Sequence, residues 1–210
     1  LPNAHVVFQD CANTGNIQAP NATRVGGLLG FAGSANGESC ASSSELLTSY
    51  NSGNITARGM AGGLEGCGYN VRVESAYNTG YVTVSGLAAD GPYAGGLVGR
   101  ATRQLTVKRA YNTGLVTYNG VDLTGTAAGA ICGDVANGNA SFSNTHYLEL
   151  SCTQAAGRLA GDGITKQTSE VMQSVDFADT TLGTPFHFDS NNVNGHFPVF
   201  IANVVDLTTE

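Results

Sequence analysis

The chain of 210 residues has no tryptophan, two methionines and five prolines, and only 12% of its residues are charged. Nine lysines and arginines face 16 aspartates and glutamates, which gives a formal net charge of −7. Proteins that bind nucleic acid need a cationic stripe to neutralise phosphates, so this class is excluded. No apolar run reaches the length of a membrane-spanning helix, which excludes helical insertion into a membrane. Glycine is abundant instead, with 29 residues, as in many β-rich extracellular proteins.

Cysteine is also sparse, and its five copies form no Cys-x-x-Cys pair. Together with four scattered histidines, this spacing predicts no zinc site. We expect one or two disulfides in an oxidising compartment, with Cys40–Cys67 and Cys132–Cys152 as candidate pairs and Cys11 left for an intermolecular bond. The alternative is a set of small buried thiols that pack as apolar residues.

Two short elements alternate along most of the chain. The first reads Tyr-Asn-x-Gly followed by an apolar residue and threonine, and an earlier copy at Asn13 and a degenerate copy at Asn144 flank the others. Its three full copies begin at Tyr50-Asn51, Tyr77-Asn78 and Tyr111-Asn112. The second element lies between these copies as Gly26-Gly27-Leu28, Gly62-Gly63-Leu64, Gly95-Gly96-Leu97 and Gly129-Ala130-Ile131. Such internal similarity is the mark of a repeat architecture, with insertions placed in loops.

The repeat predicts an all-β fold, a right-handed parallel β-solenoid of about four to five coils. Each element is short, alternates apolar and polar positions and is bounded by Gly and Asn, which is typical of strands and turns. One cycle cannot bury a core alone, so neighbouring coils must stack with equivalent residues in register. Tyr50, Tyr77 and Tyr111 are then expected to form an aromatic stack, and Asn51, Asn78 and Asn112 a hydrogen-bonded ladder. We favour a structural role for these rings over the alternative, sugar binding.

The repeat stops near residue 152, which divides the chain into solenoid repeats with an N-terminal strand (1–152) and a C-terminal cap (153–210). Residues 165–174 have a polar start and an apolar edge that predict a short helix. Five of the eight phenylalanines follow, and residues 197–205 are typical of a closing strand. Solenoids have unpaired edges at both ends, so we expect the bulky C-terminal segment to protect one of them. The apolar strands at either end favour a head-to-tail homopolymer.

Gly-Gly-Leu-x-Gly followed by Tyr-Asn-Thr-Gly-x-Val-Thr resembles the GLUG repeat of bacterial surface proteins and adhesins, over roughly residues 11–200. The same repeat occurs in the non-catalytic part of some IgA-cleaving metallopeptidases. The resemblance implies a β-solenoid and a surface location, and it implies no catalytic residues within the repeats. The five cysteines depart from the family's usual composition.

No common catalytic motif is present, so we expect neither an enzyme nor a cofactor. The acidic candidates Glu65, Glu74 and Asp134 share no common strand position, which argues against a paired-carboxylate cleft. The sole basic cluster, Arg100, Arg103, Lys108 and Arg109, is expected in a loop and an edge strand. Asp162 and Asp189 could bind calcium, but ordinary turn chemistry explains both better, and no metal site is predicted.

Three Asn-x-Ser/Thr sequons, at Asn21, Asn54 and Asn139, are N-glycosylation candidates if the protein is secreted. Together these features predict a non-catalytic extracellular structural protein, a rod that assembles into a fibre or supports adhesion. The alternatives are a carbohydrate-binding adhesin module that contacts cell-surface glycans, or a non-catalytic fragment of a larger surface peptidase.

Overall fold

The computed structural model describes residues 4–33, 42–86, 91–118 and 128–200 of the chain. It contains two compact units, Leu1–Lys166 and Gln167–Glu210. The first unit is a parallel β-solenoid of about four turns, as the repeat predicts. It extends to Lys166, beyond the expected boundary at residue 152.

Each coil contributes short strands to three stacked parallel sheets. The first coil contains β1 (His5–Gln9), β2 (Ala12–Asn13), β3 (Ile17–Ala19), β4 (Arg24–Gly26) and β5 (Leu29–Ala32). The second contains β6 (Ser43–Leu47), β7 (Tyr50–Asn51), β8 (Ile55–Ala57) and β9 (Met60–Gly62). The later coils contain β10 (Glu65–Asn78), β11 (Val82–Val84), β12 (Ala94–Gly95), β13 (Val98–Asn112), β14 (Val116–Tyr118), β15 (Ala128–Gly129), β16 (Cys132–Val135) and β17 (Ala140–Leu148).

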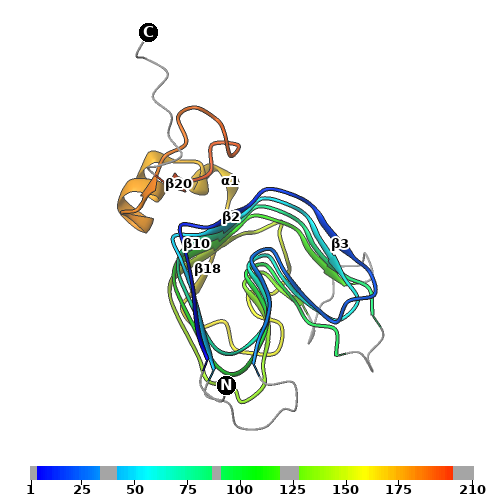
Figure 1. Ribbon diagram of the computed structural model, residues 1–210. Helices are drawn as coiled ribbons and strands as arrows, with labels where there is room; N and C mark the ends of the chain where they lie inside the picture. The colour runs from blue at the N-terminus through cyan, green and yellow to red at the C-terminus, as the bar shows by residue number, and fades with distance from the viewer. Residues whose placement is uncertain (1–3, 34–41, 87–90, 119–127, 201–210) are drawn as a thin grey trace. The chain divides into compact units, whose positions relative to one another are not determined.

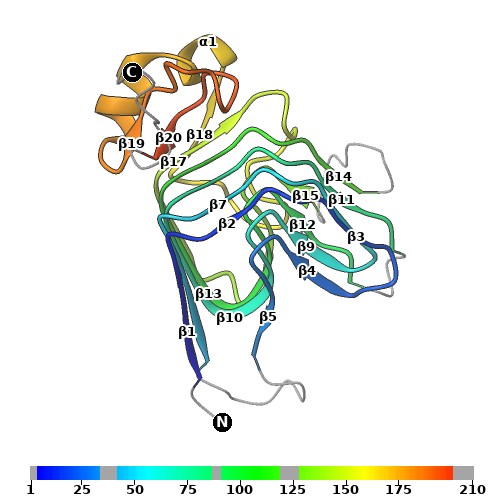
Figure 2. The same ribbon diagram turned by 45° about the horizontal axis from the view of Figure 1, so that its top comes forward.

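Strand order follows chain order in every sheet. The largest sheet runs β1-β6-β10-β13-β17-β18, where β18 is Ile164–Gln167, and the smaller sheets run β3-β8-β11-β14 and β4-β9-β12-β15. Along the stack the coils trace one path, coloured from blue through cyan to green (Figure 1). Figure 2 shows β2 and β7 running side by side at one corner of this path, where they pair in parallel.

The register places like over like. Tyr77 pairs with Tyr50 on one side and with Tyr111 on the other. Val82 likewise lies between Ile55 and Val116. The variable length of each cycle is therefore taken up between the sheets, and the two sequence elements form the fixed positions of every coil.

The core is a column of small and branched apolar side chains inside the coils. Leu46, Val73, Val82, Leu105 and Val116 have no exposed surface. Because strands buried in a parallel sheet lose nearly all contact with water, each such side chain contributes about 1.5 to 3 kcal/mol of transfer free energy.

A left-handed backbone corner recurs on every coil, just before the Tyr-Asn element. The positive φ angles at this position are 54°, 46°, 52°, 50° and 47°, at Asp10, Thr48, Ser75, Arg109 and Asn144 respectively. Their neighbours pair in register, so the five corners lie above one another. Such a conformation is strained for most residues other than glycine, and most of all for a β-branched one.

Replacing Thr48 by glycine should therefore raise the free energy of unfolding by about 1 kcal/mol, because strain is removed at a φ of 46°. The backbone bond from Thr48 N–H to Glu74 O, at 3.1 Å, is kept. The urea midpoint measures the change. The matched control is Thr106→Gly within β13, where ordinary strand backbone should make glycine destabilising. If Thr48→Gly is less stable than the parent chain, the backbone at Thr48 is not strained.

The same register corrects the alignment of the last, degenerate repeat. Asn144 takes the corner position of Arg109, while His146 lies over Tyr111 and Tyr147 over Asn112. The ladder motif is thus replaced by His-Tyr on the final coil, and Asn144 does not continue it. The sequence alone aligned Asn144 with the ladder asparagines because the residue type is the same, whereas the strand register places it three residues before the ladder position.

The second unit contains α1 (Ser169–Met172), the π-helix η2 (Asp176–Leu182), β19 (Phe186–His187) and β20 (Val199–Phe200). The expected short helix is confirmed as α1, but it is shorter than predicted, because residues 165–167 belong to β18. The Thr168 side chain caps α1 by accepting a bond from Val171 N–H. β20 pairs antiparallel with β19 and confirms the start of the closing strand. Residues 201–205 of that expected strand lie outside the described residues.

Candidate functional site

The tyrosine stack forms as predicted. The ring centroids of Tyr50 and Tyr77 are 4.8 Å apart and those of Tyr77 and Tyr111 are 5.0 Å apart, with interplanar angles of 6° and 1°. Tyr77 is 2% exposed and Tyr111 is fully buried. The faces of Tyr77 and Tyr111 are buried against other rings and are not free to stack on a sugar, whereas Tyr50 is half-buried. The stack supports a structural role for the two inner rings.

The asparagine ladder also forms, and it extends to the first coil. The carboxamide nitrogen of each asparagine donates to the carboxamide oxygen of the next, at 2.6 Å from Asn13 to Asn51, 2.6 Å from Asn51 to Asn78 and 2.7 Å from Asn78 to Asn112. The same nitrogens donate to the carbonyls of Gly15, Gly53, Gly80 and Gly114 at 2.7 to 2.9 Å. The ladder therefore fixes both the stacking of the coils and the turn after each Tyr-Asn pair.

The two sequence elements meet at this ladder. A Cβ atom added to Gly63 would lie 2.4 Å from the carboxamide carbon of Asn78, and one added to Gly96 would lie 2.4 Å from that of Asn112. The carbonyl oxygen of the next coil would lie still closer, 2.3 Å at Gly63 and 2.0 Å at Gly96, so only glycine fits between the ladder and the neighbouring backbone. The repeated glycines signalled tight packing in the sequence, but their partner was not identified there.

The ladder ends at a buried histidine and tyrosine. His146 and Tyr147 are each 6% exposed, and His146 Nε2 lies 2.7 Å from Asn144 Oδ1. Burial lowers the pKa of the His146 imidazole to about 4. The ring is therefore neutral at physiological pH and acts as a packing residue on top of Tyr111.

One polar pair interrupts the apolar core. Glu65, which is fully buried, stands where neighbouring coils have Leu29 and Val98. Its Oε2 accepts a 2.7 Å bond from Ser44 Oγ, and Oε1 has no hydrogen-bond partner. Burial raises the pKa of Glu65 to about 7, although the bond from Ser44 acts in the opposite direction. From the sequence, Glu65 was considered only as a member of a paired-carboxylate cleft, and its alignment with Leu29 and Val98 in the repeat is the signal that could have indicated its burial.

The predicted Cys132–Cys152 disulfide is not formed. Val116 N–H donates to Ser151 O as Val82 N–H does to Leu115 O, so Cys152 takes the core position of Val116 on the next turn. Cys132 pairs instead with Ala156, on a different side of the coil. The two cysteines are separated by register, and the alternative of small buried thiols is correct for both.

Of the other described cysteines, Cys67 is buried and Cys11 is partly exposed. Cys67 is a buried thiol, and its expected partner Cys40 lies outside the described residues. Burial raises the pKa of the Cys67 thiol, and it does so still more for Cys132. Neither thiol is poised to react. Cys11 is partly exposed, and its role as an intermolecular thiol stays a prediction.

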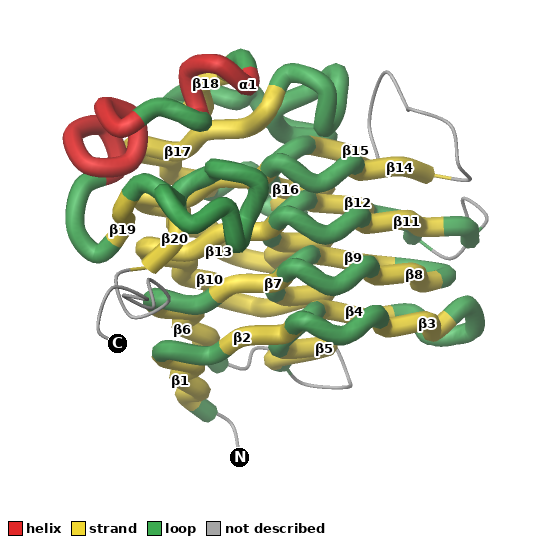
Figure 3. The backbone as a smooth tube through the Cα atoms, turned by 90° about the horizontal axis from the view of Figure 1, so that it is seen from above, coloured by secondary structure: helices red, strands yellow, loops and turns green. Residues whose placement is uncertain are grey.

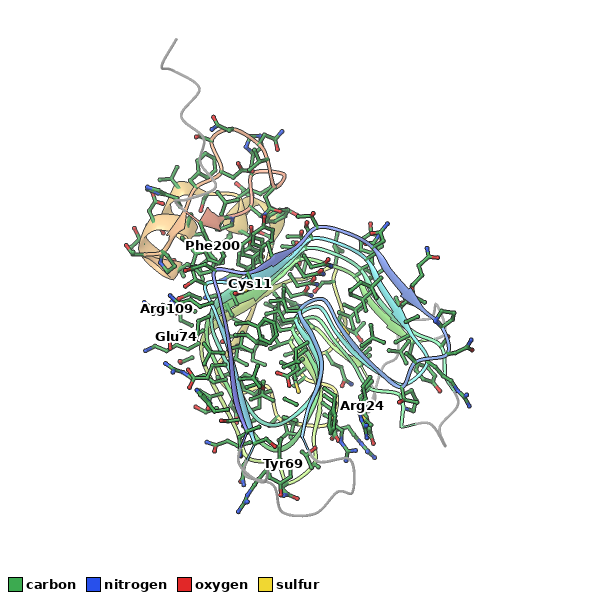
Figure 4. All side chains as sticks on the ribbon, viewed as in Figure 1. Cys11, Arg24, Tyr69, Glu74, Arg109 and Phe200 are labelled. Carbon is green, nitrogen blue, oxygen red and sulfur yellow. The ribbon has the colours of Figure 1, made fainter. Side chains whose placement is uncertain are left out.

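All four residues of the basic cluster lie on β13, which is an internal strand because it pairs on both sides. Two of its members make ion pairs with Glu74: Arg109 at 2.7 Å and Lys108 at 3.9 Å, with Arg72 of β10 joining at 2.5 Å. Figure 4 shows Glu74 and Arg109 side by side on the outer side of the coil. The predicted placement of this cluster at an unpaired edge was therefore wrong, and three of its cations instead pair with carboxylates on neighbouring coils, Lys108 and Arg109 with Glu74 and Arg100 with Asp134.

The three acidic candidates are held in separate surroundings. Glu65 faces inward, Glu74 is on the outer face, and Asp134 pairs with Arg100 at 3.0 Å. In the second unit, the buried carboxylate of Asp189 accepts bonds from the N–H groups of Val193, Asn194 and His196 at 2.6 to 3.1 Å. These bonds hold the loop after Asp189 in place, in agreement with the prediction that Asp189 stabilises a turn.

The sequon asparagines Asn21, Asn54 and Asn139 are all exposed. Asn54 Oδ1 also accepts a 2.9 Å bond from Tyr81 N–H, which links it to the following coil. Exposure makes each site accessible to a glycan, and whether any is modified stays a prediction.

The geometry defines the class of protein: a β-solenoid held by an internal asparagine ladder and tyrosine stack. Comparison with known proteins found no matching family model, no matching curated protein and no matching solved structure. The resemblance to GLUG repeats therefore stays a prediction from the motifs. Within the described residues, no helix is long and apolar enough to span a membrane, and no three His, Cys, Asp or Glu side chains gather as a metal site.

Proposed function

We propose that this chain is a non-catalytic structural module, a stiff β-solenoid segment that supports adhesion or display at a cell surface. The observation that carries the proposal is the unbroken ladder from Asn13 to Asn112, which ties four successive coils through side-chain bonds that are buried except at the Asn13 end. Backbone bonds in three parallel sheets run along the same axis. All these bonds must break together when the stack is sheared.

An extracellular location supports this role and is part of the proposal. A chain in which only 12% of the residues are charged resists non-specific ionic contacts, and three exposed sequons offer sites for glycans. The GLUG-like motifs point the same way. A fragment of a larger surface peptidase would use the solenoid in the same manner, as the non-catalytic support.

Single-molecule pulling tests the mechanical role. With the chain held between two marker domains, we expect the solenoid to unfold in one or two cooperative steps at a force well above that of an isolated hairpin. Asn51→Ala should lower this force, because it removes ladder bonds to both neighbouring coils.

The matched control is Gln18→Ala, which changes an exposed side chain of β3 outside the ladder and should leave the force unchanged. Coils that peel away one at a time at low force would contradict a load-bearing rod, as would equal effects of the two substitutions.

A further inference from the structure

The first coil presents a complete row of strands that are paired on one side only. Among the described residues, β1, β3 and β4 end their sheets, β2 pairs only with β7, and β5 pairs only with the start of β10. Figure 3 shows these five strands as the lowest row of the stack. Their outer N–H and C=O groups are free to accept another strand.

The core is also incompletely covered at this end. Phe8 and Ile17 are partly exposed, whereas their partners on the second coil, Leu46 and Ile55, are 0% and 1% exposed. Val7, on the outer face of β1, is 48% exposed. β1 has none of the devices that normally protect an edge, since it contains no lysine, proline or bulge.

The opposite end of the stack is better protected. Among the described residues, β18, β14 and β15 are the last strands of their sheets there. β18 contains the exposed Lys166, a charged side chain of the kind that discourages edge pairing, whereas β1 contains no such charge. The first coil is therefore the end that favours pairing with a second copy.

We propose that two copies of this chain join through β1 as an antiparallel pair with a two-fold axis at Val7. The strand His5–Gln9 is self-complementary about its centre: inward Val6 lies opposite inward Phe8 of the other copy. Val7 lies opposite Val7 on the outer face, and His5 opposite Gln9. The largest sheet then continues from one copy into the other, with both apolar faces inside.

Such an interface is isologous, so it closes at two copies and does not propagate into a fibre. It goes beyond the structural role proposed above and does not depend on that role.

Disulfide trapping tests the register directly. In a Cys11→Ser, Cys40→Ser background, Val7→Cys should form a linked dimer under mild oxidation, because residues facing each other across an antiparallel pair have Cα atoms about 4.5 to 5.5 Å apart. Gln9→Cys is the matched control: its two copies would lie about 14 Å apart along the strands and should not link.

Sedimentation velocity over a range of concentrations tests the stoichiometry. We expect a monomer–dimer equilibrium that stops at two, and a shift to monomer in Val7→Lys, which places two like charges opposite each other. Tyr81→Lys is the control, since Tyr81 is 57% exposed away from β1 and should leave the dimer intact. Unchanged circular dichroism and melting of Val7→Lys show that it folds.

The proposal is overturned if the parent chain is only monomeric, if it forms open-ended polymers, or if Val7→Cys and Gln9→Cys link equally well.

Discussion

Replacing both members of the buried polar pair, as S44V/E65V, should make the solenoid more stable at pH 8 by about 3 kcal/mol. The neighbouring coils already hold valine at both positions, Val71 next to Ser44 and Val98 next to Glu65. The variant therefore copies packing that the fold accepts. It also removes an acid whose Oε1 atom lacks a partner.

The gain should depend on pH in a defined direction. The folded pKa of Glu65 is about 7 and its ordinary value is 4.5, so the folded state holds this proton more tightly. The contribution of Glu65 to stability is thus fully present below pH 4.5 and is lost as the pH rises to 7. The difference in stability between S44V/E65V and the parent should grow over this window and level off above it.

His146 acts in the opposite sense and must be separated from Glu65. Its folded pKa of about 4 lies below the ordinary 6.5, so its contribution is present above pH 6.5 and is lost as the pH falls toward 4. The two groups partly cancel in the parent chain. Chemical denaturation between pH 4 and 8 should then show a weak pH dependence in the parent.

Glu65→Gln is the matched control because it keeps the shape and the acceptor for Ser44 Oγ but does not titrate. It should show stability that rises from pH 4 to 6.5, the trend due to His146 alone. If Glu65→Gln and the parent have the same pH profile, Glu65 does not hold a raised pKa.

The architecture was predictable from the sequence because aligning the repeat copies shows which residues pair between neighbouring coils. Once Tyr50, Tyr77 and Tyr111 are aligned, stacking neighbours must place like over like, and the aromatic stack and the asparagine ladder follow. The strand positions needed no knowledge of loop structure. Parallel stacking and internal packing are therefore properties of the motif itself.

The wrong predictions concern a disulfide, a repeat alignment and the burial of an acid, and the first two depend on strand register outside the motif. The pairing of Cys132 with Cys152 looked plausible from spacing, but an extra residue after Tyr147 and the coil path place them on different sides. Asn144 was matched by residue type although its position is the corner before the motif. Glu65 lies inside the Gly-Gly-Leu-x-Gly element, at the position of Leu29 and Val98, so aligning the repeats indicates an apolar, buried position although the residue type suggests an exposed one.

Asn78→Ala should be among the most damaging single substitutions in the solenoid, with a loss of about 3 to 5 kcal/mol in the free energy of unfolding. Asn78 is fully buried and uses its carboxamide three times. It donates to Gly80 O at 2.8 Å and to Asn112 Oδ1 at 2.7 Å, and it accepts from Asn51 at 2.6 Å. Removing it strands polar atoms on two neighbouring coils where water does not reach.

Asn13→Ala is the matched control because Asn13 makes the same kinds of bond at the partly exposed end of the ladder. Water can replace its lost partners, so we expect a loss of only about 1 kcal/mol. Urea unfolding of both variants measures the difference, and hydrogen exchange at the coils on either side of Asn78 should accelerate together. Equal losses in the two variants would show that burial of the ladder contributes little, and that backbone pairing alone holds the coils in register.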